Sequence, residues 1–175
     1  MKVVLMDRDG TVIETPPDHR VDKIEKVVLR PSALKAMGSL AQHDFNVIFV
    51  TNQSGIAEGL IDDKTSREVH DRMLELLAPS GINILATYVC PHQQASDCAC
   101  RKPRTQMILE AAADFEINLP TTYVVGDRLT DVEAGLNVGA KTILVQDEVR
   151  MTGCLEPTYT ASDLYQAAQY IISNS

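Results

Sequence analysis

The sequence predicts an α/β protein built on a doubly wound parallel sheet. Short, continuous apolar runs alternate with longer amphipathic segments along the 175 residues of the chain. The short runs are typical of strands buried on both faces, and the longer segments have the spacing of helices. This alternation favours parallel strands joined by right-handed crossovers. Polar clusters follow several of the runs, and ligands of such sheets bind beyond the carboxyl ends of the strands.

Five strands are expected at the apolar runs. The first covers residues 3–6 and ends abruptly at two carboxylates, Asp7 and Asp9. The others are expected at 46–50, 84–89, 122–125 and 141–145. These lengths suit ordinary strands, and polar or turn-forming residues close each run.

Helices are expected where apolar residues recur at helical spacing. Pro31 and Ser32 open the first helix, and Asp62 or Asp63 caps a second that runs to about residue 78. Further helices are expected at 105–115, in a short segment ending near 137, and at 161–172, whereas 12–30 and 151–160 are expected to be loops. The predicted inward faces are Leu34, Met37, Leu40 and Ala41 in the first helix, and Val69, Met73, Leu76 and Leu77 in the second.

The composition predicts one globular domain, 1–175. Hydrophobic residues make up 45% of the chain and charged residues 23%, the balance of a soluble protein. A net charge of −8 argues against binding to nucleic acid or to an anionic membrane. No apolar run approaches the roughly 18 residues of a membrane span, and Asp7 comes too early for a signal peptide. We therefore expect a cytoplasmic protein, without a prediction of its oligomeric state.

Asp7 and Asp9 are the first candidates for chemistry. Residues two apart on an extended chain point to the same side, so the two carboxylates can share a metal ion or divide two tasks. A calcium loop of the EF-hand type would place its glycine sixth, whereas Gly10 is fourth when counted from Asp7. The remaining alternative is an ordinary turn with two solvated aspartates.

Further polar residues follow later strands and would meet the two aspartates at one edge of the sheet. Hydrolysis of a phosphate monoester needs a nucleophile, a proton donor, a divalent cation and fixed donors on the phosphoryl oxygens. The chain offers Asp7 as nucleophile, Asp9 as acid and then base, Asp7 and Asp127 as Mg²⁺ ligands, Thr51 and Lys102 as donors, and Asp131 as a support.

Three of the four cysteines lie close together in the sequence. Cys90, His92, Cys98 and Cys100 supply three thiolates and one imidazole, a complete tetrahedral set for structural zinc. The alternative is incidental thiols beside a histidine; Cys154 is distant and is expected to bind no metal. Zinc would pin the loop ahead of Lys102. A local positive pocket in an acidic protein would then be formed by Arg101, Lys102, Arg104 and Arg128.

Taken together, these motifs resemble the haloacid dehalogenase superfamily. They are Asp-x-Asp-Gly-Thr at 7–11, Thr51, Lys102, and Gly-Asp-x-x-x-Asp at 126–131. The resemblance implies a Rossmann-like sheet with strand order 3-2-1-4-5 and no large cap domain. It also implies an aspartyl-phosphate intermediate and a Mg²⁺ ligand from the backbone carbonyl of Asp9. An aspartate at position 9 is similar to the phosphatases and phosphotransferases of the superfamily rather than to its dehalogenases.

Within the superfamily, the cysteine motif resembles a zinc-loop branch that has two main substrates. The branch contains histidinol-phosphate phosphatases and D-glycero-D-manno-heptose 1,7-bisphosphate phosphatases. The first group is favoured by Pro16-Pro17, by the Arg101-Lys102-Pro103 sequence directly after Cys100, and by Gly126-Asp127-Arg128. The stretch 51–57, Thr-Asn-Gln-Ser-Gly-Ile-Ala, resembles the heptose group.

Glu58 decides the expected substrate. The heptose enzymes usually carry arginine here, and a carboxylate would instead attract the ammonium and imidazole of histidinol phosphate. We therefore expect histidinol phosphate, with the heptose bisphosphate and a non-catalytic regulatory domain as alternatives. Glu14, Asp18 and Glu58 are the predicted contacts to the cationic end, and further substrate contacts are predicted at Asn52, Gln53, Ser54, Arg101 and Arg128.

Overall fold

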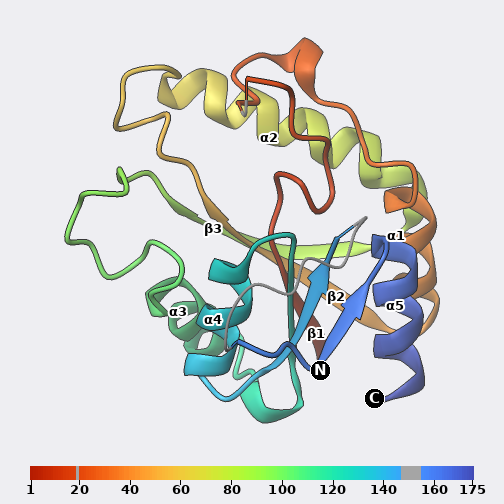
Figure 1. The fold of residues 1–175 in the computed structure, drawn as a ribbon. Coiled ribbons are helices and arrows are strands. Elements are labelled where there is room, and N and C mark those ends of the chain that lie inside the picture. Colours follow the sequence, from red (N-terminus) through yellow and green to blue (C-terminus); the bar gives the residue numbers. More distant parts are fainter. Residues whose placement is uncertain (19, 147–154) are drawn as a thin grey trace.

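A six-stranded parallel sheet forms the centre of the computed structural model, which describes residues 1–18, 20–146 and 155–175 (Figure 1). The strand order is β3-β2-β1-β4-β5-β6. The strands are β1 (Lys2–Met6), β2 (Phe45–Asn52), β3 (Asn83–Cys90), β4 (Tyr123–Gly126), β5 (Lys141–Val145) and β6 (Tyr159–Ala161). The predicted fold class and the order of the first five strands are therefore confirmed.

The edge strand β6 was not predicted. It pairs with β5 through three residues only, and Ala161 alone among them is buried. So short a segment has no readable apolar run, and the sequence assigns its first two residues to a loop. Residues 155–158 lie outside helices and strands, as predicted, whereas the remainder of that loop prediction, 151–154 with Cys154, lies outside the described residues.

Alternation along β1 explains why this strand lies inside the sheet. Val4 and Met6 pack into a core cluster on one face, while Val3 and Leu5 pack into a second cluster on the other. Successive side chains of a strand point to opposite faces, so a wholly apolar strand needs helices on both sides. Burial on both faces brings the end of β1, and the aspartates after it, to the middle of the sheet edge.

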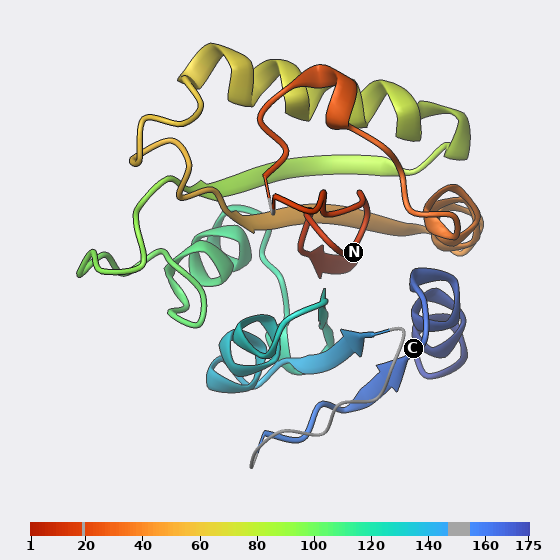
Figure 2. The same cartoon turned by 45° about the horizontal axis from the view of Figure 1, so that its top comes forward.

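Helices cover both faces. α1 (Ala33–Gln42), α2 (Asp63–Leu77) and α5 (Leu164–Ser173) pack into the first cluster, and α3 (Gln106–Asp114) and α4 (Leu129–Asn137) into the second. Figure 2 shows α1 and α5 side by side, with α3 and α4 across the sheet from them. Short 3₁₀ helices lie at η1 (Ile24–Lys26), η2 (Ala78–Ser80) and η3 (Leu119–Thr121).

The predicted caps and faces are mostly confirmed. Asp62 caps α2, because its carboxylate accepts a hydrogen bond from the backbone N–H of Thr65 at 2.7 Å. The prediction that Leu34 faces inward is wrong, because this residue is 41% exposed. The inward face of α1 is formed by Ala33, Ala36, Met37 and Leu40. Because alanine is small, Ala33 and Ala36 let α1 pack close to the sheet. The inward face is therefore rotated around the helix relative to the predicted one. No helix within the described residues is long and apolar enough to cross a membrane.

Candidate active site

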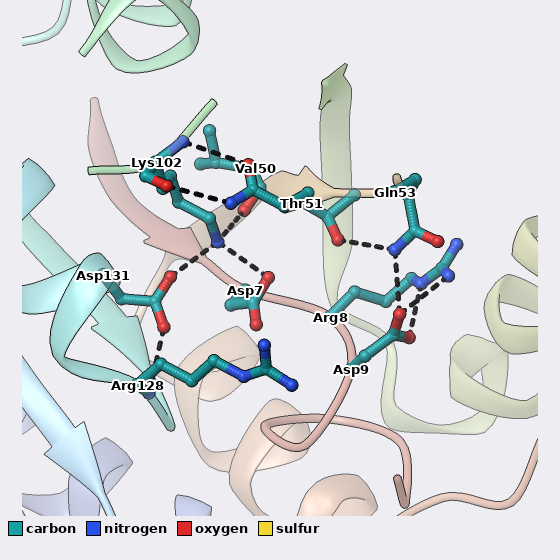
Figure 3. Close-up of polar contacts among 10 residues, drawn as sticks. Asp7, Arg8, Asp9, Val50, Thr51, Gln53, Lys102, Arg128 and Asp131 are labelled. Atoms are coloured by element: carbon teal, nitrogen blue, oxygen red, sulfur yellow. Dashed lines mark hydrogen bonds and ion pairs between the residues drawn. The ribbon is translucent and has the colours of Figure 1, made fainter. Parts of the chain in front are cut away.

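Asp7 lies at the carboxyl end of β1, in the middle of the sheet edge (Figure 3). Its backbone N–H donates to the carbonyl of Val125 at 2.8 Å, which ties the residue to the neighbouring strand β4. The side chain is largely buried, and Oδ1 accepts a hydrogen bond from Nζ of Lys102 at 2.8 Å. The carboxylate is thus held at one orientation by both neighbours.

Lys102 is the buried cation of the site. Its ammonium donates to Asp7, to Oδ1 of Asp131 at 2.6 Å and to the carbonyl of Val50 at 2.6 Å. These three acceptors match the three hydrogens of an ammonium group. Burial lowers the pKa of Lys102, but the carboxylates of Asp131 and Asp7 outweigh burial and raise this pKa above its ordinary value. Lys102 therefore stays charged.

One lysine does not balance the three carboxylates around it. Burial raises the pKa of Asp7 to about 7; Lys102 opposes the rise, whereas Asp131 and Asp127 add to it. Burial, followed by the negative charge of Asp131, raises the pKa of Asp127 to about 6. The cluster therefore carries more buried negative charge than its own cation offsets, which favours binding of a further cation.

The geometry of this cluster fits a hard divalent ion. Carboxylate oxygens of Asp7, Asp127 and Asp131 lie within 4.8 Å of one another. Asp131 uses its two oxygens on Lys102 and on the backbone N–H of Arg128, at 3.1 Å, whereas Oδ1 of Asp127 is buried without a hydrogen-bond partner. Asp127 and Asp7 are thus the carboxylates best placed to bind Mg²⁺, with Asp131 holding Lys102.

Gly10 leaves the space that this arrangement needs. Its φ is +83°, and a Cβ at this position would overlap the carboxylate of Asp127. The guanidinium of Arg30 donates to the Gly10 carbonyl at 2.7 Å and fixes the turn from the other side. Glycine is therefore required both by the backbone conformation and by the close approach of Asp127.

The side chain of Asp9 points away from the carboxylate cluster of Asp7, Asp127 and Asp131 and toward the buried Arg8. Nε of Arg8 donates to Oδ1 at 2.9 Å and a terminal nitrogen of Arg8 to Oδ2 at 3.1 Å, while the amide of Gln53 donates to Oδ2 at 2.8 Å. Burial raises the pKa of Asp9, but the charge and hydrogen bonds of Arg8 and the bond from Gln53 hold this pKa below its ordinary value. Sequence reasoning missed Arg8, although its place between the two aspartates was visible.

The end of β2 forms the opposite wall of the site. Thr51 is buried, and its hydroxyl oxygen accepts a hydrogen bond from Gln53 at 2.9 Å, so its own hydrogen is free to donate to a ligand. Asn52 accepts from the backbone N–H of Lys102 at 3.0 Å and donates to the carbonyl of Lys102 at 3.1 Å. Ser54 lines the pocket. Asn52 and Gln53 thus use their amides on neighbouring site residues.

The sulfur cluster lies beside the loop that carries Lys102. Ligand atoms of Cys90, His92, Cys98 and Cys100 all lie within 4.8 Å of one another, and Nδ1 of His92 is 3.2 Å from Sγ of Cys100. Three thiols and one imidazole converging on one point have the chemistry of a closed zinc site. Arg101 directly follows Cys100, and one of its guanidinium nitrogens donates to the carbonyl of His92 at 3.1 Å.

A pocket of about 520 Å³ opens over these residues. Its cationic walls come from Arg101, Lys102, Arg104 and Arg128, and its remaining lining includes Asp7, Asp9, Thr15, Val21, Thr51, Asn52, Ser54, Gln94, Ser96, Thr130 and Asp131. Figure 3 shows the Arg128 side chain beside Asp7. Among the described residues that line the pocket, the carboxylates are those of the predicted catalytic and supporting aspartates.

The predicted contacts to a cationic substrate do not line this pocket. Glu14, Asp18 and Glu58 are absent from its described lining. Asp18 forms an exposed ion pair with Lys26 at 2.5 Å, and Glu58 lies 3.9 Å from Arg20. Asp18 and Glu58 thus lie beside surface cations rather than in the pocket.

Comparisons with known proteins agree with this site. A family model described as HAD-hydrolase-like matches residues 99–167. The chain is 34% identical over 180 residues to the D-glycero-beta-D-manno-heptose-1,7-bisphosphate 7-phosphatase of Bordetella bronchiseptica, with both proteins covered completely. It is 36% identical over 151 residues, 85% of its length, to the histidine biosynthesis bifunctional protein HisB of Bacteroides fragilis, of which it spans 40%.

A solved structure matches the fold from end to end. It is the D,D-heptose 1,7-bisphosphate phosphatase from B. bronchiseptica complexed with magnesium and phosphate, with a TM-score of 0.93, 33% identity and complete coverage of both chains. Fold, site and full-length similarity place the chain in one family: it belongs to the HAD-like hydrolases. Within that family it is a phosphatase. The expected superfamily is confirmed, as is an enzyme rather than a non-catalytic domain.

Proposed function

We propose that this protein is a Mg²⁺-dependent phosphomonoester phosphatase that forms an aspartyl-phosphate on Asp7. The observation that carries the proposal is the Asp7 carboxylate, held 2.8 Å from Lys102 in a pocket with cationic walls. A nucleophile beside a fixed cation meets the main demand of phosphoryl transfer, which is positioning together with charge stabilisation.

Two displacements complete the proposed reaction. First, an Asp7 oxygen attacks phosphorus, the P–O bond to the leaving group breaks, and Asp9 gives a proton to the leaving oxygen. Second, water attacks the phosphorus of the aspartyl-phosphate, Asp9 takes the proton of that water, and phosphate leaves from Asp7. The approach of an anionic phosphoryl group raises the pKa of Asp9 and so favours its donor form in the first step.

Thr51 is the proposed hydrogen-bond donor to the phosphoryl oxygens. Lys102, whose three hydrogens are used on Asp7, Asp131 and Val50, supplies positive charge beside them. Mg²⁺, held by Asp7, Asp127 and the backbone carbonyl of Asp9, would supply positive charge against the charge of the transferring group. Zinc bound by the sulfur cluster would supply a cross-link that keeps the loop ahead of Lys102 in place. Asp131 holds Lys102 and the start of α4, so it orients the ammonium rather than contacting substrate.

The pocket favours a substrate with a second anionic group. Arg101, Arg104 and Arg128 line the pocket beside Lys102. Arg104 is paired with Asp97 at 2.7 Å, which leaves Arg101 and Arg128 as the arginines best placed to meet a second anionic group. A sugar bisphosphate of the heptose 1,7-bisphosphate type fits this charge best, and the full-length relative from B. bronchiseptica is named for that substrate. Histidinol phosphate is the second candidate, supported by similarity to HisB. Its ammonium would need a carboxylate partner, which Glu14, Asp18 and Glu58 do not provide in this pocket.

Side-by-side kinetics test the proposal. Phosphate release with Mg²⁺ is measured on D-glycero-D-manno-heptose 1,7-bisphosphate and on L-histidinol phosphate, and kcat/KM is compared. We expect the bisphosphate to be preferred by tenfold or more, which is about 1.4 kcal/mol of transition-state stabilisation. A preference for histidinol phosphate would overturn the substrate choice, and Mg²⁺-independent hydrolysis would overturn the mechanism.

A further inference from the structure

The carboxylate of Asp9 is surrounded by donors that the proposed reaction does not use. Arg8 forms a two-point contact with it, at 2.9 Å to Oδ1 and 3.1 Å to Oδ2, and Gln53 adds a third hydrogen bond to Oδ2 at 2.8 Å. The Arg8 side chain is only 3% exposed, whereas the Asp9 side chain is 26% exposed and lines the pocket. Arg8 lies against the Asp9 carboxylate (Figure 3) and is not among the described residues that line the pocket.

These donors leave one oxygen of Asp9 available. A carboxylate offers about four lone-pair positions, two on each oxygen. Oδ2 accepts from both Arg8 and Gln53, whereas Oδ1 accepts from Nε of Arg8 alone. The planar fork of a guanidinium also fixes the plane of the carboxylate, which a single hydrogen bond does not do.

Gln53 is itself anchored to the frame of the site. Its backbone N–H donates to the carbonyl of Cys90 at 2.7 Å, at the end of β3, and its amide also donates to the Thr51 hydroxyl at 2.9 Å. Both hydrogens of the amide are therefore used, one on Asp9 and one on Thr51. A clamp built on strand ends holds a reacting group more accurately than one built on a loop.

We propose that Arg8 and Gln53 are positioning residues that orient Asp9, so that Oδ1 exchanges the proton with the leaving group and with water. This inference rests on the proposed phosphatase reaction, in which Asp9 is the acid and base. It assigns to Arg8 and Gln53 a task that does not involve contact with substrate. Loss of either residue would leave Asp9 present but wrongly oriented.

Leaving-group dependence separates this role from a purely structural one. Para-nitrophenyl phosphate releases a stable phenolate that needs no proton, whereas an alkyl phosphate needs one. The kcat/KM value reports the steps up to the first P–O cleavage, so the two substrates test the donor directly. The alkyl phosphate used is whichever of the heptose bisphosphate and histidinol phosphate the wild-type enzyme hydrolyses faster.

The variants are Gln53→Met, Arg8→Lys and Arg8→Met, with Arg72→Met as matched control. Arg72 forms an arginine–carboxylate pair with Glu75 at 2.9 Å on the exposed side of α2. A well-placed acid–base group contributes roughly 10²–10⁴-fold, so loss of its orientation is expected to lower kcat/KM for the alkyl phosphate by about 10- to 100-fold. For para-nitrophenyl phosphate the fall is expected to stay below about threefold.

Two further readouts complete the experiment. The second displacement also needs Asp9, so acid-quenched variants should retain more covalent phosphate than the wild type during turnover of para-nitrophenyl phosphate. Arg8→Lys, which keeps the charge but loses the fork, should lie between wild type and Arg8→Met. Should Arg8→Met fail to fold, as judged by its melting curve, Gln53→Met decides the matter, because Gln53 is half-buried and methionine preserves its size.

Equal losses on both substrates would overturn the inference, as would an unchanged kcat/KM for the alkyl phosphate in Gln53→Met. The wild-type enzyme provides the separate check on the proposed function. If it hydrolyses neither substrate with Mg²⁺, the phosphatase proposal itself fails. If it hydrolyses both and the variants match Arg72→Met, only the positioning role is lost.

Discussion

Asp7, Lys102 and Asp131 form a row in which one buried cation lies between two carboxylates. The ammonium contacts them at 2.8 Å and 2.6 Å, and all three residues are largely buried. Hydrogen bonds to charged groups are stronger than those between neutral groups, and the nonpolar surroundings strengthen them further. The row therefore fixes Asp7 in place before any substrate arrives, which lowers the cost of reaching the transition state.

The Asp7→Asn variant tests whether Asp7 is the nucleophile. The amide keeps the size of the carboxylate but cannot form the aspartyl-phosphate, so turnover with Mg²⁺ should fall below detection while the protein stays folded. Phosphate release and a melting curve measure the two properties, with exposed Asp71→Asn on α2 as the control. Turnover at the wild-type rate would refute the covalent mechanism.

The sequence predicts the position of some site residues but not of others. Asp7, Thr51, Lys102 and Asp127 each stand in a short motif beside a strand or in the loop before a helix, and topology brings them to one edge. The sequence does not predict the contacts of Arg8, because they depend on a side-chain direction that residue spacing does not encode. The substrate contacts assigned to Glu14, Asp18 and Glu58 depended on loop paths, which carry no periodic signal.

At the scale of elements, side chains at the end of β2 contact both Lys102 and Asp9. The Asn52 side chain brackets the backbone of Lys102 with two hydrogen bonds, and Gln53 links Asp9 to Thr51. Predicted as substrate contacts, both amides instead hold other site residues, although Asn52 also lines the pocket. A motif can thus mark a site correctly while leaving open which partner each side chain takes.

Elements with long apolar runs were predictable, and short or irregular ones were not. The strands β1, β2, β4 and β5 each bury a run that a parallel sheet requires, whereas the edge strand β3 carries an apolar run that is mostly half-buried. The β6 strand has three residues and one buried side chain, so pairing with β5 rather than its own pattern determines it. Leu34 shows the same limit in a helix: large apolar size suggested burial, yet the alanines of α1 face the sheet.

The sulfur cluster should control the loop that precedes Lys102. Replacing the half-exposed ligand Cys98 by serine removes one thiolate, and we expect bound zinc to fall well below one per chain. Arg101 and Lys102 would then lose their fixed approach, with an expected fall in kcat/KM of about 10- to 100-fold, the effect typical of groups that support a site. Elemental analysis and kinetics in excess Mg²⁺ measure the two effects. Purified wild-type protein without zinc would contradict the proposal.

The whole molecule combines a net charge of −8 with a cationic pocket. The loop before α3 supplies Arg101, Lys102 and Arg104, and the start of α4 supplies Arg128. Both segments reach the same edge because they follow β3 and β4, and the carboxyl ends of parallel strands lie at one edge of the sheet. The fold thus concentrates positive charge at the pocket of a protein whose net charge is negative.

The negative charge of the carboxylates at this edge links metal binding to the stability of the entire fold. Asp127 is half-buried, and its Oδ1 is buried without a hydrogen-bond partner among like charges, so metal-free protein is destabilised by a group that Mg²⁺ would satisfy. A ligand that binds only the folded state at one hundred times its Kd adds about 2.7 kcal/mol. For a chain of this size, that corresponds to a rise in Tm of about 5–10 °C.

The Asp127→Asn variant should separate the cost of the Asp127 charge in the metal-free protein from the contribution of Asp127 to Mg²⁺ binding. The metal-free variant is expected to melt at or above the wild-type temperature, because a buried charge is gone, whereas the rise in Tm with Mg²⁺ should disappear because a ligand is gone. Melting curves of wild type, Asp127→Asn and Asp71→Asn with and without Mg²⁺ measure both effects, and Asp71→Asn should behave as wild type. If Mg²⁺ raised the Tm of all three equally, the ion would bind elsewhere, and the carboxylates at the end of β1 and β4 would not be its site.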